Sequence, residues 1–193
     1  MDYLLLTAAH TPATMRAPTT FHVRGILAGV IAAACGALLL KVFPSLETEL
    51  FIGGASRLAG LLAGVAAVRV DEGWALVFPG QPLMVTAACS ATDFALMTAA
   101  LLGWHFARRA DRTALFPVAA AGALIVAVPL AITVNALRLV AVAQTHRWVI
   151  PRMPEAYGHF LHLLTGVAVF LPALIGMNLL LEFYGRSRIP ARD

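Results

Sequence analysis

The chain has 193 residues, of which 60% are hydrophobic, and its mean hydropathy is +0.83. Only 12% of the residues are charged, whereas a soluble domain is about a quarter charged. This composition, with two cysteines and basic residues that are scattered or flank apolar segments, excludes disorder, a disulfide-rich secreted module and nucleic-acid binding. We therefore predict an integral membrane protein whose surroundings are lipid.

The apolar segments, taken in chain order, predict a bundle of helices. The first 20 residues lack the basic start and long apolar core of a secretory signal, and we interpret residues 1–20 as a lead-in segment. A helix needs about 20 residues to cross a hydrocarbon core of about 30 Å. Apolar segments of that kind cover residues 25–43, 50–68, 88–106, 114–142 and 160–183. We expect an all-α domain of five transmembrane helices over residues 21–185, followed by a basic tail over residues 186–193.

Residues 73–86 have a different pattern from the segments around them. Two stretches of alternating apolar residues flank Pro79, Gly80 and Pro82, which is typical of a hairpin with a turn at its tip. Because lipid cannot satisfy the backbone of a hairpin, we expect it at the membrane interface or packed on protein, just before the third span.

The charges of the short loops predict how the spans are oriented. Two groups of arginines follow the third and fifth spans: Arg108, Arg109 and Arg112, then Arg186, Arg188 and Arg192. The positive-inside rule places both groups in the cytoplasm. With five spans, Lys41 then lies inside, and the amino terminus and the hairpin lie outside.

Polar side chains inside apolar spans are costly and therefore point to function. The candidates are Cys89 and Asp93 at the start of the third span, Asn135 and Arg138 late in the fourth, and His159 and His162 at the start of the fifth. Arg138 lies about 24 residues into its span, a climb of about 36 Å at about 1.5 Å per residue. We therefore expect a thiol, a cation and an imidazole at one depth, near the outer face.

Acyl transfer is the chemistry that such a trio supports. A cysteine thiolate, favoured at the amino-terminal end of a helix, attacks a carbonyl, and a histidine takes up the proton and returns it to the leaving group. An arginine stabilises the oxyanion of the tetrahedral intermediate. Plainer interpretations stay open: Cys89 as a small apolar side chain, Arg138 as a snorkelling cation, His162 as an interfacial residue. Asp93 either pairs with Arg138 or caps its helix, and Cys35, in an alanine-rich span, is expected to pack.

Three motifs resemble the exosortase/archaeosortase family. They are Ala88-Cys89-Ser90, Asn135-Ala-Leu-Arg138, and His162 followed four residues later by Gly166, in that order within about residues 50–175. The chain is shorter than the common members and has Ala91-Thr92-Asp93 where the family often has a glycine and a basic residue. It is therefore similar to a compact variant such as exosortase K.

The resemblance implies a cysteine transpeptidase or protease of the bacterial or archaeal cytoplasmic membrane, facing outward and using no cofactor. In it Cys89 is the nucleophile, Arg138 the transition-state stabiliser and His162 the general acid/base, with Asn135, Asp93 and His159 in support. The implied substrates are exported, membrane-anchored proteins with a carboxy-terminal tag, which consists of a short motif, a transmembrane helix and a basic tail.

Two other classes of function compete with the enzyme. A haem-binding or redox subunit would use His159 or His162 with His146, because His105 lies at the inner end of the third span. A small-solute transporter or a scaffold subunit would line a path with the few buried charges. Neither of these classes requires Cys89.

Overall fold

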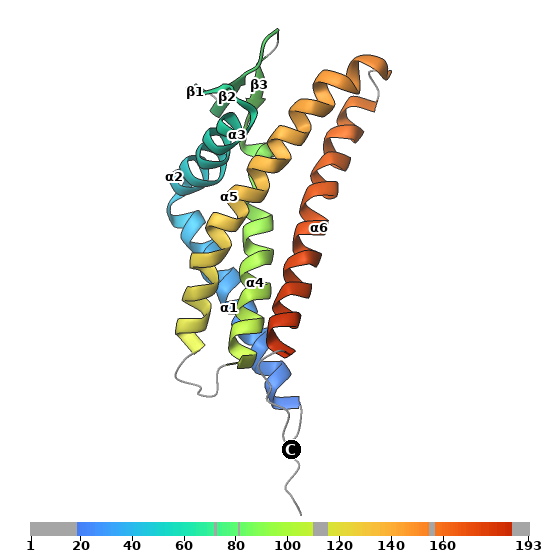
Figure 1. Cartoon of the computed structure of the whole chain (residues 1–193). Coiled ribbons are helices and arrows are strands. Elements are labelled where there is room, and N and C mark those ends of the chain that lie inside the picture. The colour runs from blue at the N-terminus through green and yellow to red at the C-terminus, as the bar shows by residue number, and fades with distance from the viewer. Residues whose placement is uncertain (1–18, 72, 81, 110–115, 155–156, 187–193) are drawn as a thin grey trace, which may run out of the picture.

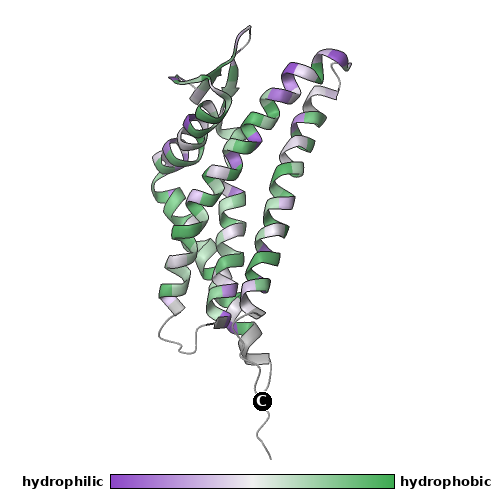
Figure 2. Cartoon of the chain, in the orientation of Figure 1, coloured by the Kyte–Doolittle hydropathy of each residue, from purple (hydrophilic) through white to green (hydrophobic). Residues whose placement is uncertain are grey.

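A computed structural model describes residues 19–71, 73–80, 82–109, 116–154 and 157–186. The predicted lead-in and basic tail lie almost wholly outside these ranges. Four long helices form the bundle: α1 (Thr19–Val42), α4 (Thr92–Arg109), α5 (Phe116–Trp148) and α6 (Gly158–Arg186) (Figure 1). Each contains a segment long and apolar enough to cross a membrane. Hydrophobic residues cover most of these helices, while hydrophilic residues gather where α5 ends and α6 begins (Figure 2). The chain is thus an all-α, multi-pass membrane protein, as predicted.

The predicted span over residues 50–68 is not among the four candidate spans of the described residues, so the count of five is not confirmed. This region is a short helix α2 (Pro44–Leu46), a π-helix η1 (Glu47–Gly54) and a helix α3 (Ala55–Ala63). Gly64 ends α3 in a left-handed conformation, with φ of 67°, and Val65 donates back to the carbonyl of Gly60 at 2.9 Å. The remaining apolar residues belong to a strand, and a mean hydropathy does not separate a strand from a helix.

The predicted hairpin is confirmed and belongs to a larger sheet. Strands β1 (Ala66–Val70), β2 (Gly73–Val77) and β3 (Leu83–Val85) form an antiparallel sheet in the order β1-β2-β3. The buried side chains of Leu76 and Val85 pack in one cluster with Leu139 of α5. The sheet therefore rests on protein, as the hydrogen-bonding needs of its backbone require. Strand β1 was not predicted, and its first residues lie in the segment that was expected to be the second span.

Helices α1 and α4 run antiparallel in close contact. A Cβ on Gly29 would lie 2.6 Å from the carbonyl oxygen of Ala100, and a Cβ on Gly25 would lie 2.4 Å from the ring of Trp104. The start of α1 therefore lies at the same end of the bundle as the end of α4. The predicted topology put the start of the first span and Arg108 on opposite sides, and this was wrong, because Gly25 of α1 lies against Trp104 and Arg108 of α4.

The sheet, the start of α4, the end of α5 and the start of α6 share the other end of the bundle (Figure 1). The residues predicted to form a site come from these elements.

Candidate active site

Cys89 lies in a tight turn just before α4 rather than within it. The turn is a 3₁₀ helix, η2 (Ala87–Cys89), closed by hydrogen bonds from Cys89 N to Thr86 O at 2.8 Å and from Ser90 N to Ala87 O at 3.0 Å. Ser90 is extended, and its Oγ accepts from the backbone N of Thr92, the first residue of α4, at 3.3 Å. Cys89 is buried, with 8% of its surface exposed, and it is a free cysteine.

Arg138 connects Cys89 to His162. Its guanidinium donates to the carbonyl oxygen of Cys89 at 3.5 Å and to Nε2 of His162 at 3.4 Å, and it lies over the ring of Phe170 at 5.3 Å. Only 7% of Arg138 is exposed. No ion pair of the described residues includes Arg138, so the charge is buried beside a carbonyl, an imidazole and an aromatic face. The structure therefore brings together the predicted cysteine, arginine and histidine.

Asn135 holds the main chain of this site in place. Its Nδ2 donates to the carbonyl oxygen of Cys89 at 3.0 Å and to that of Phe51 in η1 at 3.2 Å, and its side chain is fully buried. Asn135 Oδ1 and Arg138 Nε are buried and have no hydrogen-bond partner among the described residues.

The bond between Arg138 and His162 defines the tautomer of the histidine. A guanidinium can only donate, so Nε2 of His162 is the acceptor and the ring proton of the neutral imidazole lies on Nδ1. His146, an exposed residue of α5, places its ring edge-to-face to that of His162, with 6.3 Å between centroids. His159 lies in the first turn of α6 by its backbone, and its side chain is outside the described part of the structure.

Gly166 is explained by the arginine. It faces Arg138 from α6, and a Cβ at this position would lie 3.1 Å from Nε. The absence of a side chain thus lets α6 approach the guanidinium closely. The spacing between His162 and Gly166, about one helical turn, places both residues against the same arginine.

The remaining predicted residues lie away from this group. Asp93 is exposed, and within the described ranges no ion pair joins it to Arg138, while the backbone N of Thr92 at the start of α4 donates to Ser90. Cys35 was expected to pack but lies exposed on α1. His105 is buried near the opposite end of α4, where its ring bonds to Asn178 Oδ1 at 3.1 Å.

The sequence missed two polar residues beside the turn, Glu47 and Thr92. Thr92 Oγ1 donates to Glu47 Oε1 at 2.7 Å, a contact between residues 45 positions apart. No motif or periodicity signals a contact of this range. The only available sign was an acidic residue at the edge of an apolar segment.

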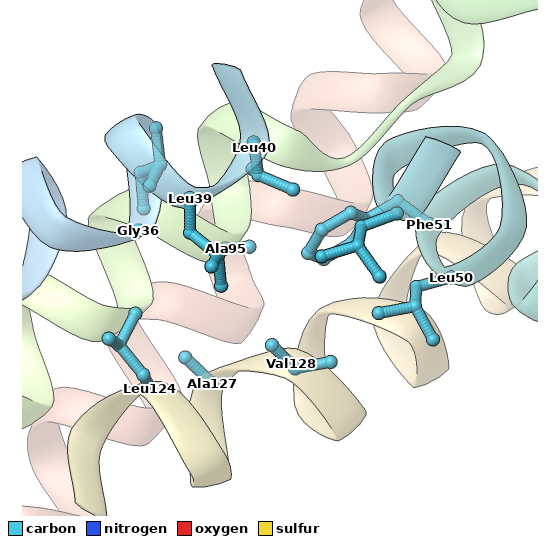
Figure 3. Close-up of a pocket in the computed structure, with 11 residues that line it drawn as sticks. Gly36, Leu39, Leu40, Leu50, Phe51, Ala95, Leu124, Ala127 and Val128 are labelled. Atoms are coloured by element: carbon cyan, nitrogen blue, oxygen red, sulfur yellow. The ribbon is translucent and has the colours of Figure 1, made fainter. Parts of the chain in front are cut away.

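An apolar cavity of about 60 Å³ lies elsewhere in the bundle, between α1, η1, α4 and α5 (Figure 3). Its lining consists of Gly36, Leu39, Leu40, Leu46, Leu50, Phe51, Ala95, Leu96, Leu124, Ala127 and Val128. Neither Cys89 nor Arg138 nor His162 belongs to this lining, so the cavity is separate from the group around Arg138. Phe51 borders both regions, since its side chain lines the cavity and its carbonyl accepts from Asn135.

No protein-family model, curated protein or solved structure matches the chain. The motif resemblance therefore stays a prediction, and the function must be argued from the geometry of Cys89, Arg138 and His162.

Proposed function

We propose that this protein is a membrane-embedded cysteine transpeptidase or protease that forms a thioester on Cys89. The observation that carries the proposal is the buried guanidinium of Arg138, which has no carboxylate partner among the described residues and joins the carbonyl of Cys89 to the ring of His162. A buried cation without a counter-ion is costly, and a guanidinium in this position can stabilise negative charge that develops during a reaction.

The geometry supports a specific sequence of proton and bond changes. The thiol of Cys89 gives its proton to Nε2 of His162, and the sulfur forms a bond to the substrate carbonyl carbon. Once protonated, Nε2 becomes a donor and can no longer accept from Arg138, so a guanidinium N–H turns to the developing oxyanion. The carbon–nitrogen bond then breaks, and His162 returns the proton to the leaving amine.

The thioester is resolved by a second nucleophile. Attack by water gives hydrolysis, whereas attack by an amine gives transfer of the acyl group, and both release the Cys89 thiol. His162 accepts the proton of the incoming nucleophile in either case. The two outcomes share every residue of the site.

The resemblance to exosortases supplies the proposed substrates and setting. These are exported, membrane-anchored proteins with a carboxy-terminal tag, in the cytoplasmic membrane of a bacterium or archaeon. The arginines at the end of α4 favour the cytoplasmic side for that end. The end that holds Cys89 then faces outward, where exported proteins are found.

Alkylation of Cys89 in native membranes tests the proposal without a known substrate. The Cys35→Ser background leaves a single thiol, and the rate of its reaction with a membrane-impermeant maleimide is measured. Arg138→Gln and His162→Ala are each expected to slow this reaction. The controls are Arg147→Gln, an exposed arginine of the same helix, and His105→Gln, a histidine distant from the site.

Processing in the host is the second measurement. Mass spectrometry of membrane proteins is expected to show uncleaved precursors in Cys89→Ser cells, and Arg138→Gln is expected to slow cleavage about 100- to 1000-fold, as the loss of an oxyanion donor does. If the Cys89→Ser strain processes the same proteins as the wild type, the enzyme proposal fails and a transporter or scaffold role is favoured.

A further inference from the structure

A chain of hydrogen bonds links the turn of Cys89 to the π-helix η1. Thr92 Oγ1 donates to Glu47 Oε1 at 2.7 Å, and Ser90 Oγ lies 2.7 Å from Thr92 Oγ1. Ser90 Oγ also accepts from the backbone N of Thr92 at 3.3 Å. These residues are half-buried, so the bonds are partly shielded from solvent.

The number of hydroxyl protons determines which group donates in each of these hydrogen bonds. A carboxylate only accepts, and Thr92 has one hydroxyl proton, which it gives to Glu47. The bond between the two hydroxyls therefore uses the proton of Ser90. Ser90 thus directs its proton towards Thr92 Oγ1 and accepts from the backbone N of Thr92, so its hydroxyl is bound as donor and as acceptor to the first residue of α4.

The π-helix holds the Cys89 turn at two points. Glu47, near its start, holds Thr92 just after the turn. Phe51, one π-helical turn further along, offers its carbonyl to Asn135, which also binds the carbonyl of Cys89. The same short element therefore fixes the chain on both sides of Ser90, and π-helical segments are found frequently at functional sites.

We propose that Glu47 is a positioning residue, which through Thr92 and Ser90 fixes the turn that presents Cys89 to its substrate. This role rests on the proposed function of Cys89. Glu47 does not touch the reacting atoms and transfers no proton. Its carboxylate anchors the start of α4, so that the thiol keeps the orientation set by the η2 turn.

Glu49 provides a matched control in the same element. Its carboxylate lies 2.7 Å from Arg69 and 4.0 Å from Arg57, and both arginines are exposed. Glu49 thus carries the same charge in the same π-helix but is bound to Arg57 of α3 and Arg69 of β1 instead of to Thr92. Glu49→Leu is expected to leave the reactivity of Cys89 unchanged.

A double-mutant cycle tests the positioning role. Glu47→Leu and Thr92→Val, each in the Cys35→Ser background, are expected to lower both the alkylation rate of Cys89 and kcat for processing by about 10- to 100-fold, with KM unchanged, because small misplacements of a reacting group are this costly. The double variant is expected to lose no more than either single one, since both remove the same bond. Glu47→Gln and Thr92→Ser keep an acceptor and a donor, and are expected to retain most of the rate.

The outcomes separate this proposal from the enzyme proposal. If Glu47→Leu and Thr92→Val react like the wild type, or if their effects add, the positioning role is wrong even when Cys89→Ser abolishes processing. If Cys89→Ser leaves processing intact, the proposed function fails, and the alkylation rates still report whether Glu47 fixes the turn. Melting temperatures of all variants identify losses that come from unfolding.

Discussion

At the scale of single residues, Arg138 is the side chain that most needs an explanation. Desolvation of a cation costs several kcal/mol, and without a carboxylate the offset comes from weaker partners. These are the carbonyl of Cys89, the lone pair of His162 and the face of Phe170. The planar guanidinium can serve all three at once, which a lysine cannot do. Snorkelling to lipid headgroups, the plainer interpretation of Arg138, does not describe this arrangement, because the group is buried in protein.

A substitution of Gly166 tests this arrangement without removing any polar group of the site. In Gly166→Ala the added methyl group would lie 3.1 Å from Nε of Arg138, so either the guanidinium or α6 must shift by a few tenths of an ångström. We expect Cys89 alkylation and processing to slow about 10-fold, since catalysis depends on fine positioning. The matched control is Gly176→Ala in the same helix, where a Cβ meets nothing within 4 Å. Equal rates in the two variants would contradict close packing of α6 on the arginine.

At the scale of elements, the segment between α1 and α4 determines the site. The sequence predicted the β2–β3 hairpin correctly because its turn residues and its alternation are local signals. It missed β1 and η1 for the opposite reason. The end of α3 depends on the left-handed conformation of Gly64, and the position of η1 depends on contacts to Thr92 and Asn135, which are distant in sequence. Local patterns therefore predicted which residues could react, but not what holds them.

Asn135 of α5 binds carbonyls of η1 and η2, and its substitution is expected to lower the stability of the protein. Asn135→Leu leaves the carbonyl of Phe51 without this donor and the carbonyl of Cys89 with only the longer bond from Arg138, and a buried carbonyl left without a bond costs about 1–3 kcal/mol. We expect a clear drop in the melting temperature of the detergent-solubilised protein, together with slower processing. Thr133→Val is the control, because Thr133 is exposed on the same helix and bonds only within it, to Pro129 O at 2.8 Å. A melting temperature equal to that of the control would show that Asn135 does not tie the turn to η1.

At the scale of the whole molecule, the difference between four and five spans changes the sidedness of the amino-terminal half. Hydropathy located the four long helices well, since length and apolar composition are what a bilayer requires. It also counted residues 50–68, because their composition is equally apolar. The consequence is larger than one helix. An extra crossing reverses the predicted side of every loop before it, so the prediction put the loop after α1 on the same side of the membrane as Arg108. In the structure α1 and α4 run antiparallel, so the loop after α1 lies on the side opposite to Arg108.

Single cysteines introduced into the Cys35→Ser, Cys89→Ser background decide between these topologies. Ser45 follows α1, Gly80 is at the tip of the hairpin and Pro117 begins α5, and all three are exposed. The fold, oriented by the positive-inside rule, predicts that a membrane-impermeant maleimide added outside intact cells labels Ser45→Cys and Gly80→Cys, and that Pro117→Cys reacts only after the membrane is opened. Five spans predict instead that Ser45→Cys behaves like Pro117→Cys, because both loops would then be cytoplasmic. Labelling of Gly80→Cys from outside would also place the Cys89 end of the bundle on the side where exported substrates arrive. If Gly80→Cys were instead protected, that end would lie in the cytoplasm, and Cys89 could not process exported proteins.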